Sequence, residues 1–154
     1  MKIKTNKKAP NFKLDSTASN PFELSKLKNA LIIYFYPKDN TPGCTVETKD
    51  FSKLYKRFKS LKYEVVGISK DDIKSHLGFK KKYKVPFQLL SDEKVQVQKK
   101  YGVWGMKSFL GKKFMGTIRS TIAINKHGKI LRVWSNVRVK NHAQEVLDFV
   151  KSQK

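Results

Sequence analysis

The feature that most constrains this sequence is an unbroken apolar run, Ala30 to Tyr36, which ends at Pro37. Its isoleucines and aromatic residues predict a strand that is buried on both faces, as in the middle of a sheet. The next residues, 38–43, are typical of a turn. Apolar side chains then recur at helical spacing, which predicts a helix from near Cys44 to about Leu61. They are Phe51, Leu54, Tyr55, Phe58 and Leu61.

The rest of the chain continues this alternation of strands and helices. We expect a strand at 63–69, a helix capped within 69–72 that runs to about 84, a short strand at 88–90, a helix from 91 to 101, a loop at 102–117, a hairpin of 120–125 with 129–137, and a helix around 143–150. This order predicts an α/β fold with a mixed central sheet and helices on both faces. No linker or repeat interrupts it, so residues 1–154 are expected to form one domain.

The chain is strongly basic, with 34 Lys and Arg against 12 Asp and Glu and a formal net charge of +22. Such a field attracts nucleic acid or anionic membranes. The lysines recur along the whole chain, however, and the one tight cluster, 80–84, is short. We therefore interpret the charge as solvated surface and expect neither nucleic acid nor membrane as a partner. No apolar run is long enough to span a bilayer or to serve as a secretory signal, so a cytoplasmic protein is expected.

Cys44 is the one cysteine of the sequence, which excludes an intrachain disulfide and a multi-cysteine metal site. A lone cysteine is commonly a small buried apolar residue. Here it follows a strand and opens a helix, where free N–H groups and the helix dipole favour a thiolate. Gly43 allows a small ligand to approach the backbone, and Thr41 supplies a hydroxyl nearby. These neighbours favour a nucleophile. The histidines lie on different elements without ligand spacing, so no metal is expected.

The segment Pro37-Lys-Asp-Asn-Thr41-Pro-Gly-Cys44 resembles the Pro-x-x-x-Thr-x-x-Cys signature of peroxiredoxins. The longer segment 35–47 is similar to the bacterioferritin comigratory protein (PrxQ) branch of that family. Further similarities to this branch occur in the same order at 89–92, 100–104 and 116–121. The resemblance thus covers nearly the whole chain. It implies a thioredoxin-like fold and a thiol-dependent peroxidase that reduces hydrogen peroxide and organic hydroperoxides without a cofactor.

The resemblance also implies a role for each matching residue. Cys44 would be the peroxidatic thiolate, and Thr41 would hydrogen-bond the sulfur and the substrate. Pro37 would wall the pocket, and the N–H groups of Gly43 and Cys44 would donate to the peroxide. Arg119 would stabilise the thiolate and the charge on the leaving oxygen.

Glu47 matches a family glutamate that orients the arginine, although it could also serve only the helix N-terminus.

The sequence departs from the family at the positions where many members carry a resolving cysteine. Lys49 occupies the first position, and Phe79 and Lys80 lie near the second. An external thiol is therefore expected, from thioredoxin, glutaredoxin with glutathione, another low-molecular thiol or a second copy of what is expected to be a monomer. The alternative function is a basic nucleic-acid-binding module on a thioredoxin-like fold.

Overall fold

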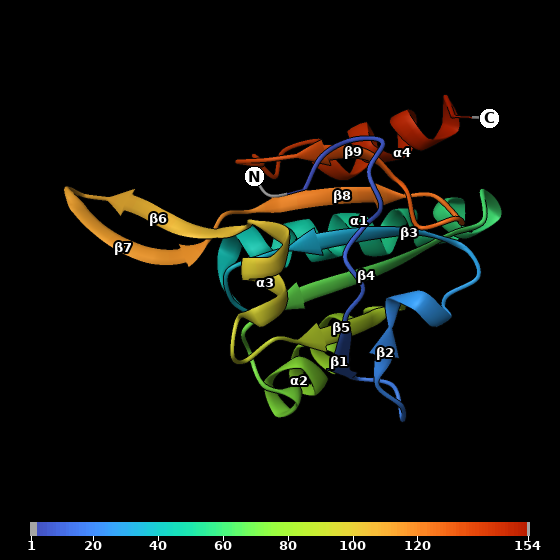
Figure 1. The fold of residues 1–154 in the computed structure, drawn as a ribbon. Helices are drawn as coiled ribbons and strands as arrows, with labels where there is room; N and C mark the ends of the chain where they lie inside the picture. The colour runs from blue at the N-terminus through green and yellow to red at the C-terminus, as the bar shows by residue number, and fades with distance from the viewer. Residues whose placement is uncertain (1–2, 154) are drawn as a thin grey trace.

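The computed structural model describes residues 3–153, which form a seven-stranded mixed sheet, a separate two-stranded sheet and several helices (Figure 1). The strands are β1 (Lys13–Ser16), β2 (Phe22–Glu23), β3 (Ala30–Phe35), β4 (Tyr63–Ser69), β5 (Gln88–Ser91), β6 (Trp104–Phe109), β7 (Lys112–Thr117), β8 (Ser120–Ile124) and β9 (Ile130–Trp134). The helices are α1 (Pro42–Ser60), α2 (Ile73–Tyr83), α3 (Gln96–Tyr101), α4 (His142–Lys151) and the 3₁₀ helix η1 (Leu24–Lys26). None of the helices within residues 3–153 is long and apolar enough to cross a membrane.

The large sheet has the order β2-β1-β5-β4-β3-β8-β9. β3 lies inside it, parallel to β4 and antiparallel to β8. All six residues of β3 are buried, which confirms the strand predicted from the apolar run. Because β3, β4 and β5 are parallel, their carboxyl ends meet at one edge of the sheet, and α1 and α2 begin there.

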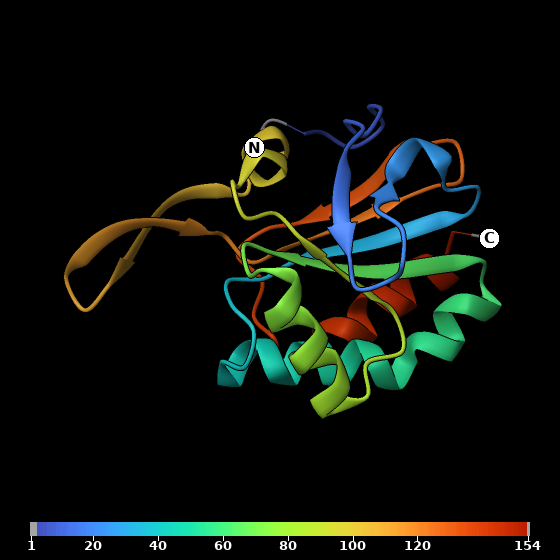
Figure 2. The same cartoon turned by 90° about the horizontal axis from the view of Figure 1, so that it is seen from below.

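Two apolar layers enclose the sheet. They explain why the run 30–36, which contains β3, has no polar residue. Ile32 and Tyr34 face α1, α2 and α4, which cover one side (Figure 2). Leu31, Ile33 and Phe35 face the opposite layer, built from α3 and the N-terminal segment. A strand in this position needs apolar side chains on both faces. The mixed sheet with helices on both sides agrees with the predicted fold class.

Most predicted elements are confirmed, but two were placed wrongly. The helix expected from residue 91 begins only at Gln96, because the Asp92 carboxylate instead accepts the N–H groups of Val97 and Gln98 at 3.3 and 2.9 Å. Residues 102–117, expected to be a loop, contain the β6–β7 hairpin. Most of its side chains are exposed, so the sequence carries no buried-face alternation to reveal strands. β1 and β2 were not predicted.

Tyr34 fixes α1 on the sheet. Its ring stacks on Phe51 with centroids 4.8 Å apart, and its hydroxyl lies 2.9 Å from Thr48 Oγ1. The ring occupies the space above Gly67, where an added Cβ would lie only 2.7 Å from Tyr34 Cζ. A side chain at position 67 would therefore displace the ring that supports the helix carrying Cys44.

This close approach predicts that Gly67→Ala destabilises the protein by about 1–3 kcal/mol through overpacking. Gly78→Ala is the matched control, because nothing lies within 4 Å of a Cβ at that helical position. The control should gain about 0.5–1 kcal/mol from helix propensity. Urea denaturation of both variants measures the free energies of unfolding. Equal effects of the two substitutions would contradict the packing argument.

Candidate active site

Cys44 lies in the first turn of α1, directly after the turn that follows β3. Thr41 is the N-cap with extended backbone angles, and Pro42 is the first helical residue, a position that suits proline because its missing N–H would have no helical partner. The Cys44 side chain is fully buried. The predicted position of Cys44 in the first turn of a helix is confirmed. Its full burial was not predicted.

The start of α1 leaves backbone donors open. The first helical hydrogen bond runs from the Thr45 N–H to the Thr41 carbonyl, so the N–H groups of Gly43 and Cys44 have no acceptor within the helix. The Thr41 side chain does not cap them. Its hydroxyl donates instead to the Lys38 carbonyl at 3.0 Å. A threonine that could cap the helix leaves its donors free for a ligand.

Arg119 joins this helix from the segment between β7 and β8. Its Nη2 donates to Cys44 Sγ at 3.3 Å, and its Nη1 donates to Glu47 Oε1 at 2.5 Å. The guanidinium therefore holds two groups one helical turn apart, each with a different nitrogen. The structure brings together the cysteine, arginine and glutamate that the sequence analysis selected.

The electrostatics of this cluster are set by burial. Glu47 is 1% exposed, and desolvation raises its pKa to about 7, although Arg119 opposes the shift. Its second oxygen, Oε2, is buried without a hydrogen-bond partner. Burial lowers the pKa of Arg119, but Glu47 and Cys44 outweigh it and the net shift is upward. Arg119 thus stays charged beside the sulfur.

Gly43 makes room for the guanidinium. A Cβ at this position would lie 3.3 Å from Arg119 Nη2, which is closer than ordinary van der Waals contact. Glycine here therefore serves the packing of the arginine as well as access to the backbone N–H groups. Pro37 lies partly buried between the end of β3 and this turn.

A buried polar network holds the turn between β3 and α1. The sequence did not predict this network. Asp39 accepts the Tyr36 hydroxyl at 2.6 Å and the Ser75 hydroxyl at 2.8 Å. Its Oδ2 also lies 2.8 Å from His76 Nδ1. His76 Nε2 is 2.9 Å from the Leu90 carbonyl, which only accepts, so Nε2 carries a proton. The Asp39 carboxyl group thus contacts Tyr36, Ser75 and His76.

Asp71 extends the network, since its Oδ2 accepts the Asp39 N–H at 2.8 Å. Ligand atoms of Asp39, Asp71 and His76 lie within 4.8 Å of one another, a grouping that could hold a metal ion. The hydrogen bonds to Tyr36, Ser75 and Leu90 already satisfy Asp39 and His76. The cluster therefore suits a structural tie between α2 and the turn before Cys44 rather than a metal centre.

The residues at or near the expected positions of a resolving cysteine are Lys49, Phe79 and Lys80, and each has a different environment. Lys49 is exposed on α1, and Phe79 is fully buried in the core. Lys80 Nζ donates to the carbonyls of Val85 and Phe87 at 2.6 and 2.8 Å, and burial lowers its pKa. Lys80 thus ties the end of α2 to the segment before β5.

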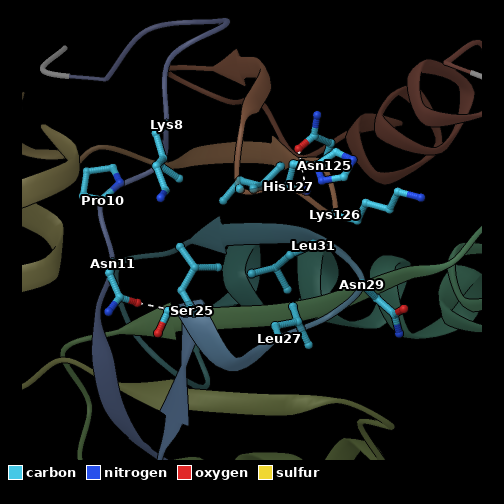
Figure 3. A pocket seen from close by; sticks show the side chains of 14 residues that line it. Lys8, Pro10, Asn11, Ser25, Leu27, Asn29, Leu31, Asn125, Lys126 and His127 are labelled. Atoms are coloured by element: carbon cyan, nitrogen blue, oxygen red, sulfur yellow. Dashed lines mark hydrogen bonds between the residues drawn. The ribbon is translucent and has the colours of Figure 1, made fainter.

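A groove of about 640 Å³ lies at the opposite edge of the sheet (Figure 3). It runs between the N-terminal segment at Lys8 and the turn of Asn125 and His127, with Leu31 at its base. Leu31 is near the start of β3, whereas Cys44 follows the end of that strand. The groove is therefore separate from the cysteine site.

Comparison with known proteins agrees with this geometry. Residues 5–133 match the model of the AhpC/TSA family. The chain is 38% identical to peroxiredoxin Bcp of Bacillus subtilis over 152 residues, which are 98% of this chain and 97% of that protein.

Solved structures agree as well. The fold is similar to bacterioferritin comigratory protein of Xanthomonas campestris, with 34% identity, a TM-score of 0.87, and coverage of 92% of this chain and 91% of that one. A cysteine-to-serine mutant of PrxQ from Xylella fastidiosa has 33% identity and a TM-score of 0.92, with 98% and 97% covered. The chain therefore belongs to the AhpC/TSA family, as a peroxiredoxin of the bacterioferritin comigratory protein (PrxQ) type.

Proposed function

We propose that this peroxiredoxin reduces hydroperoxides with the thiolate of Cys44 and that an external thiol regenerates it. The observation that carries the proposal is the 3.3 Å contact between Arg119 Nη2 and Cys44 Sγ at a helix end with open N–H donors. A cation and backbone donors beside a sulfur favour its nucleophilic form. The structural study of the Xanthomonas relative concerned alkyl peroxide reduction, which supports organic hydroperoxides as substrates here too.

The reaction is a two-electron transfer to the peroxide. The thiolate attacks one peroxide oxygen, the O–O bond breaks, and its electron pair leaves on the other oxygen. That oxygen takes up a proton and departs as water or an alcohol, while Cys44 becomes a sulfenic acid. The guanidinium of Arg119 and the open N–H groups of Gly43 and Cys44 stabilise the negative charge as it moves between the oxygens.

The hydrogen bond of Thr41 refines its role. A hydroxyl has one proton, and that proton is directed at the Lys38 carbonyl. The oxygen lone pairs thus remain to accept the proton of the hydroperoxide, so Thr41 orients the substrate rather than donating to the sulfur. Pro37 contributes a wall of the same pocket. Glu47 positions Arg119 through the 2.5 Å contact between Oε1 and Nη1.

Regeneration requires a second thiol, because the 154 residues contain one cysteine. A thiol attacks the sulfenic sulfur, water leaves, and a second thiol reduces the mixed disulfide. Thioredoxin and the glutathione–glutaredoxin system both supply this chemistry. Turnover with the two systems side by side identifies the reductant. The alternative of a nucleic-acid-binding module has no support in the family or in the cysteine site.

Arg119→Lys should lower the second-order rate constant for peroxide by about 10- to 1000-fold. Lysine keeps the charge but cannot place one donor on Cys44 and another on Glu47. Arg132→Lys is the matched control, since Arg132 stacks on Trp134 of β9, 4.8 Å from the ring centroid. Stopped-flow kinetics with hydrogen peroxide measures both variants. Equal rate constants for wild type and Arg119→Lys would remove Arg119 from the mechanism.

Glu47 should impose a pH dependence on stability. Its pKa is about 7 in the folded protein against 4.5 for the ordinary carboxyl group, so the native state holds the proton more tightly between these values. Stability then falls as pH rises from about 4 to about 8, by up to roughly 3 kcal/mol, relative to Glu47→Gln, which does not titrate. Denaturation of both proteins at several pH values measures this difference. A difference that is constant over that range would contradict the burial argument.

Peroxide in excess over thiol should inactivate the enzyme irreversibly. Within the chain no second thiol competes for the sulfenic acid, so a second peroxide oxidises it to a sulfinic acid that ordinary thiols do not reverse. Intact mass should increase by two oxygen atoms, and Cys44→Ser should not gain them. Thiol present throughout should preserve activity. A stable disulfide-linked homodimer instead would show that a second copy resolves Cys44.

A further inference from the structure

The β6–β7 hairpin projects away from the rest of the protein in both views (Figures 1 and 2). Among the described residues seven large apolar side chains are exposed, and five of them belong to this hairpin. They are Met106 at 61%, Phe109 at 66%, Leu110 at 87%, Phe114 at 45% and Met115 at 50%. The other two, Val46 and Leu77, lie on separate helices. Apolar exposure is thus concentrated on one projecting element, which marks an interaction site.

The apolar side chains occupy both faces of the hairpin. Met106 pairs with Met115, and Lys107 pairs with Phe114. Neighbouring positions along a strand face opposite sides, so the methionines and Phe114 lie on opposite faces. A flat protein surface could cover one face only. Apolar groups on both faces fit a medium that surrounds the hairpin.

The tip carries a leucine where the backbone disfavours it. Leu110 and Gly111 have φ angles of 51° and 80°, as in the two-residue hairpin turn that normally takes Asn-Gly. A leucine in the left-handed region costs about 1–2 kcal/mol. Leu110 is also the most exposed large apolar side chain among the described residues, at 87%. Its side chain contributes little to the folded chain, so its position indicates a function outside it.

Lysines accompany these apolar residues. Lys112 and Lys113 begin β7 directly after the turn and are exposed, and Lys107 lies on β6. The chain as a whole carries a net charge of +22. Exposed apolar side chains next to lysines match a lipid surface with anionic headgroups, where the apolar groups enter and the ammonium groups stay at the phosphates.

We propose that the tip of the β6–β7 hairpin inserts into the surface of an anionic lipid membrane. The outer edges of a two-stranded ribbon have unpaired N–H and C=O groups, which cannot enter the hydrocarbon core. The tip therefore reaches only the boundary of headgroups and acyl chains, about 5–10 Å deep. This revises the sequence-based expectation that no membrane is a partner.

Charge also favours an anionic membrane over a second copy of the chain as the partner of the hairpin. Two molecules of net charge +22 repel each other, whereas an anionic bilayer attracts each of them. The hairpin ends at Thr117, two residues before Arg119. A docked tip would therefore hold the cysteine site about one hairpin length from the lipid surface, roughly 20 Å for six strand residues. Vesicle binding itself does not depend on peroxidase activity and can be tested with the thiol blocked.

Flotation with vesicles of equimolar phosphatidylcholine and phosphatidylglycerol tests the proposal. Phe109→Ser/Leu110→Asn should weaken binding by at least about tenfold, because it removes the apolar tip. Asparagine tolerates the left-handed turn, so the variant should keep its circular dichroism spectrum and peroxidase rate. Leu77→Asn, the control on α2, removes an apolar side chain that is 47% exposed and should leave binding unchanged.

A second pair of variants tests how much the lysines of the hairpin contribute to vesicle binding. Lys112→Gln/Lys113→Gln should lower the affinity about thirtyfold, whereas Lys81→Gln/Lys82→Gln, an exposed pair on α2, should have a much smaller effect. Equal losses in the two charge variants, or a tip variant that binds like wild type, would overturn the proposal. So would the absence of binding by wild type. A tip variant that changes only the KM for a protein reductant would assign the hairpin to that protein instead.

Discussion

The proposed active site depends on one guanidinium, that of Arg119, which lies between two groups able to carry negative charge. Without Arg119, the Cys44 thiolate and the Glu47 carboxylate would be buried one helical turn apart with no cation at hydrogen-bond distance. Glu47 holds Arg119 in place, but its carboxylate also partly neutralises the positive charge of the guanidinium. Oε2 of Glu47 lacks a hydrogen-bond partner, and burial raises the pKa of Glu47 to about 7. We therefore expect its protonation state to decide how much of the Arg119 charge acts on the sulfur.

The central sheet fixes the positions of Arg119 and Cys44 relative to each other. Arg119 leads directly into β8, which pairs with β3, and β3 leads through the turn to Cys44. The helix start and the arginine thus come from adjacent strands of one rigid sheet. The Asp39–His76 network adds a third attachment, since it joins the same turn to α2. Groups held in this way need little reorganisation as charge develops on the peroxide.

The sequence predicted what local patterns determine. The apolar run set β3, the change from strand to helical spacing placed Cys44 at the start of α1, and both are confirmed. Arg119 lies 75 residues from Cys44, and only the family resemblance pointed to it. Asp39 looked like an ordinary turn residue, because its partner His76 is 37 positions away. The β6–β7 hairpin was missed for a different reason, since a strand exposed on both faces has no polar–apolar alternation.

The conformation described here suits the attack on peroxide better than the step that follows it. The Cys44 side chain is fully buried, so a protein thiol cannot reach its sulfur in line without movement of the first turn of α1. Within that turn the Thr41 side chain makes no cap to the first backbone N–H groups of the helix. A small hydroperoxide requires less displacement than a protein. The uncapped helix end whose N–H groups face the sulfur is therefore also the segment that would have to move for a protein reductant to reach Cys44.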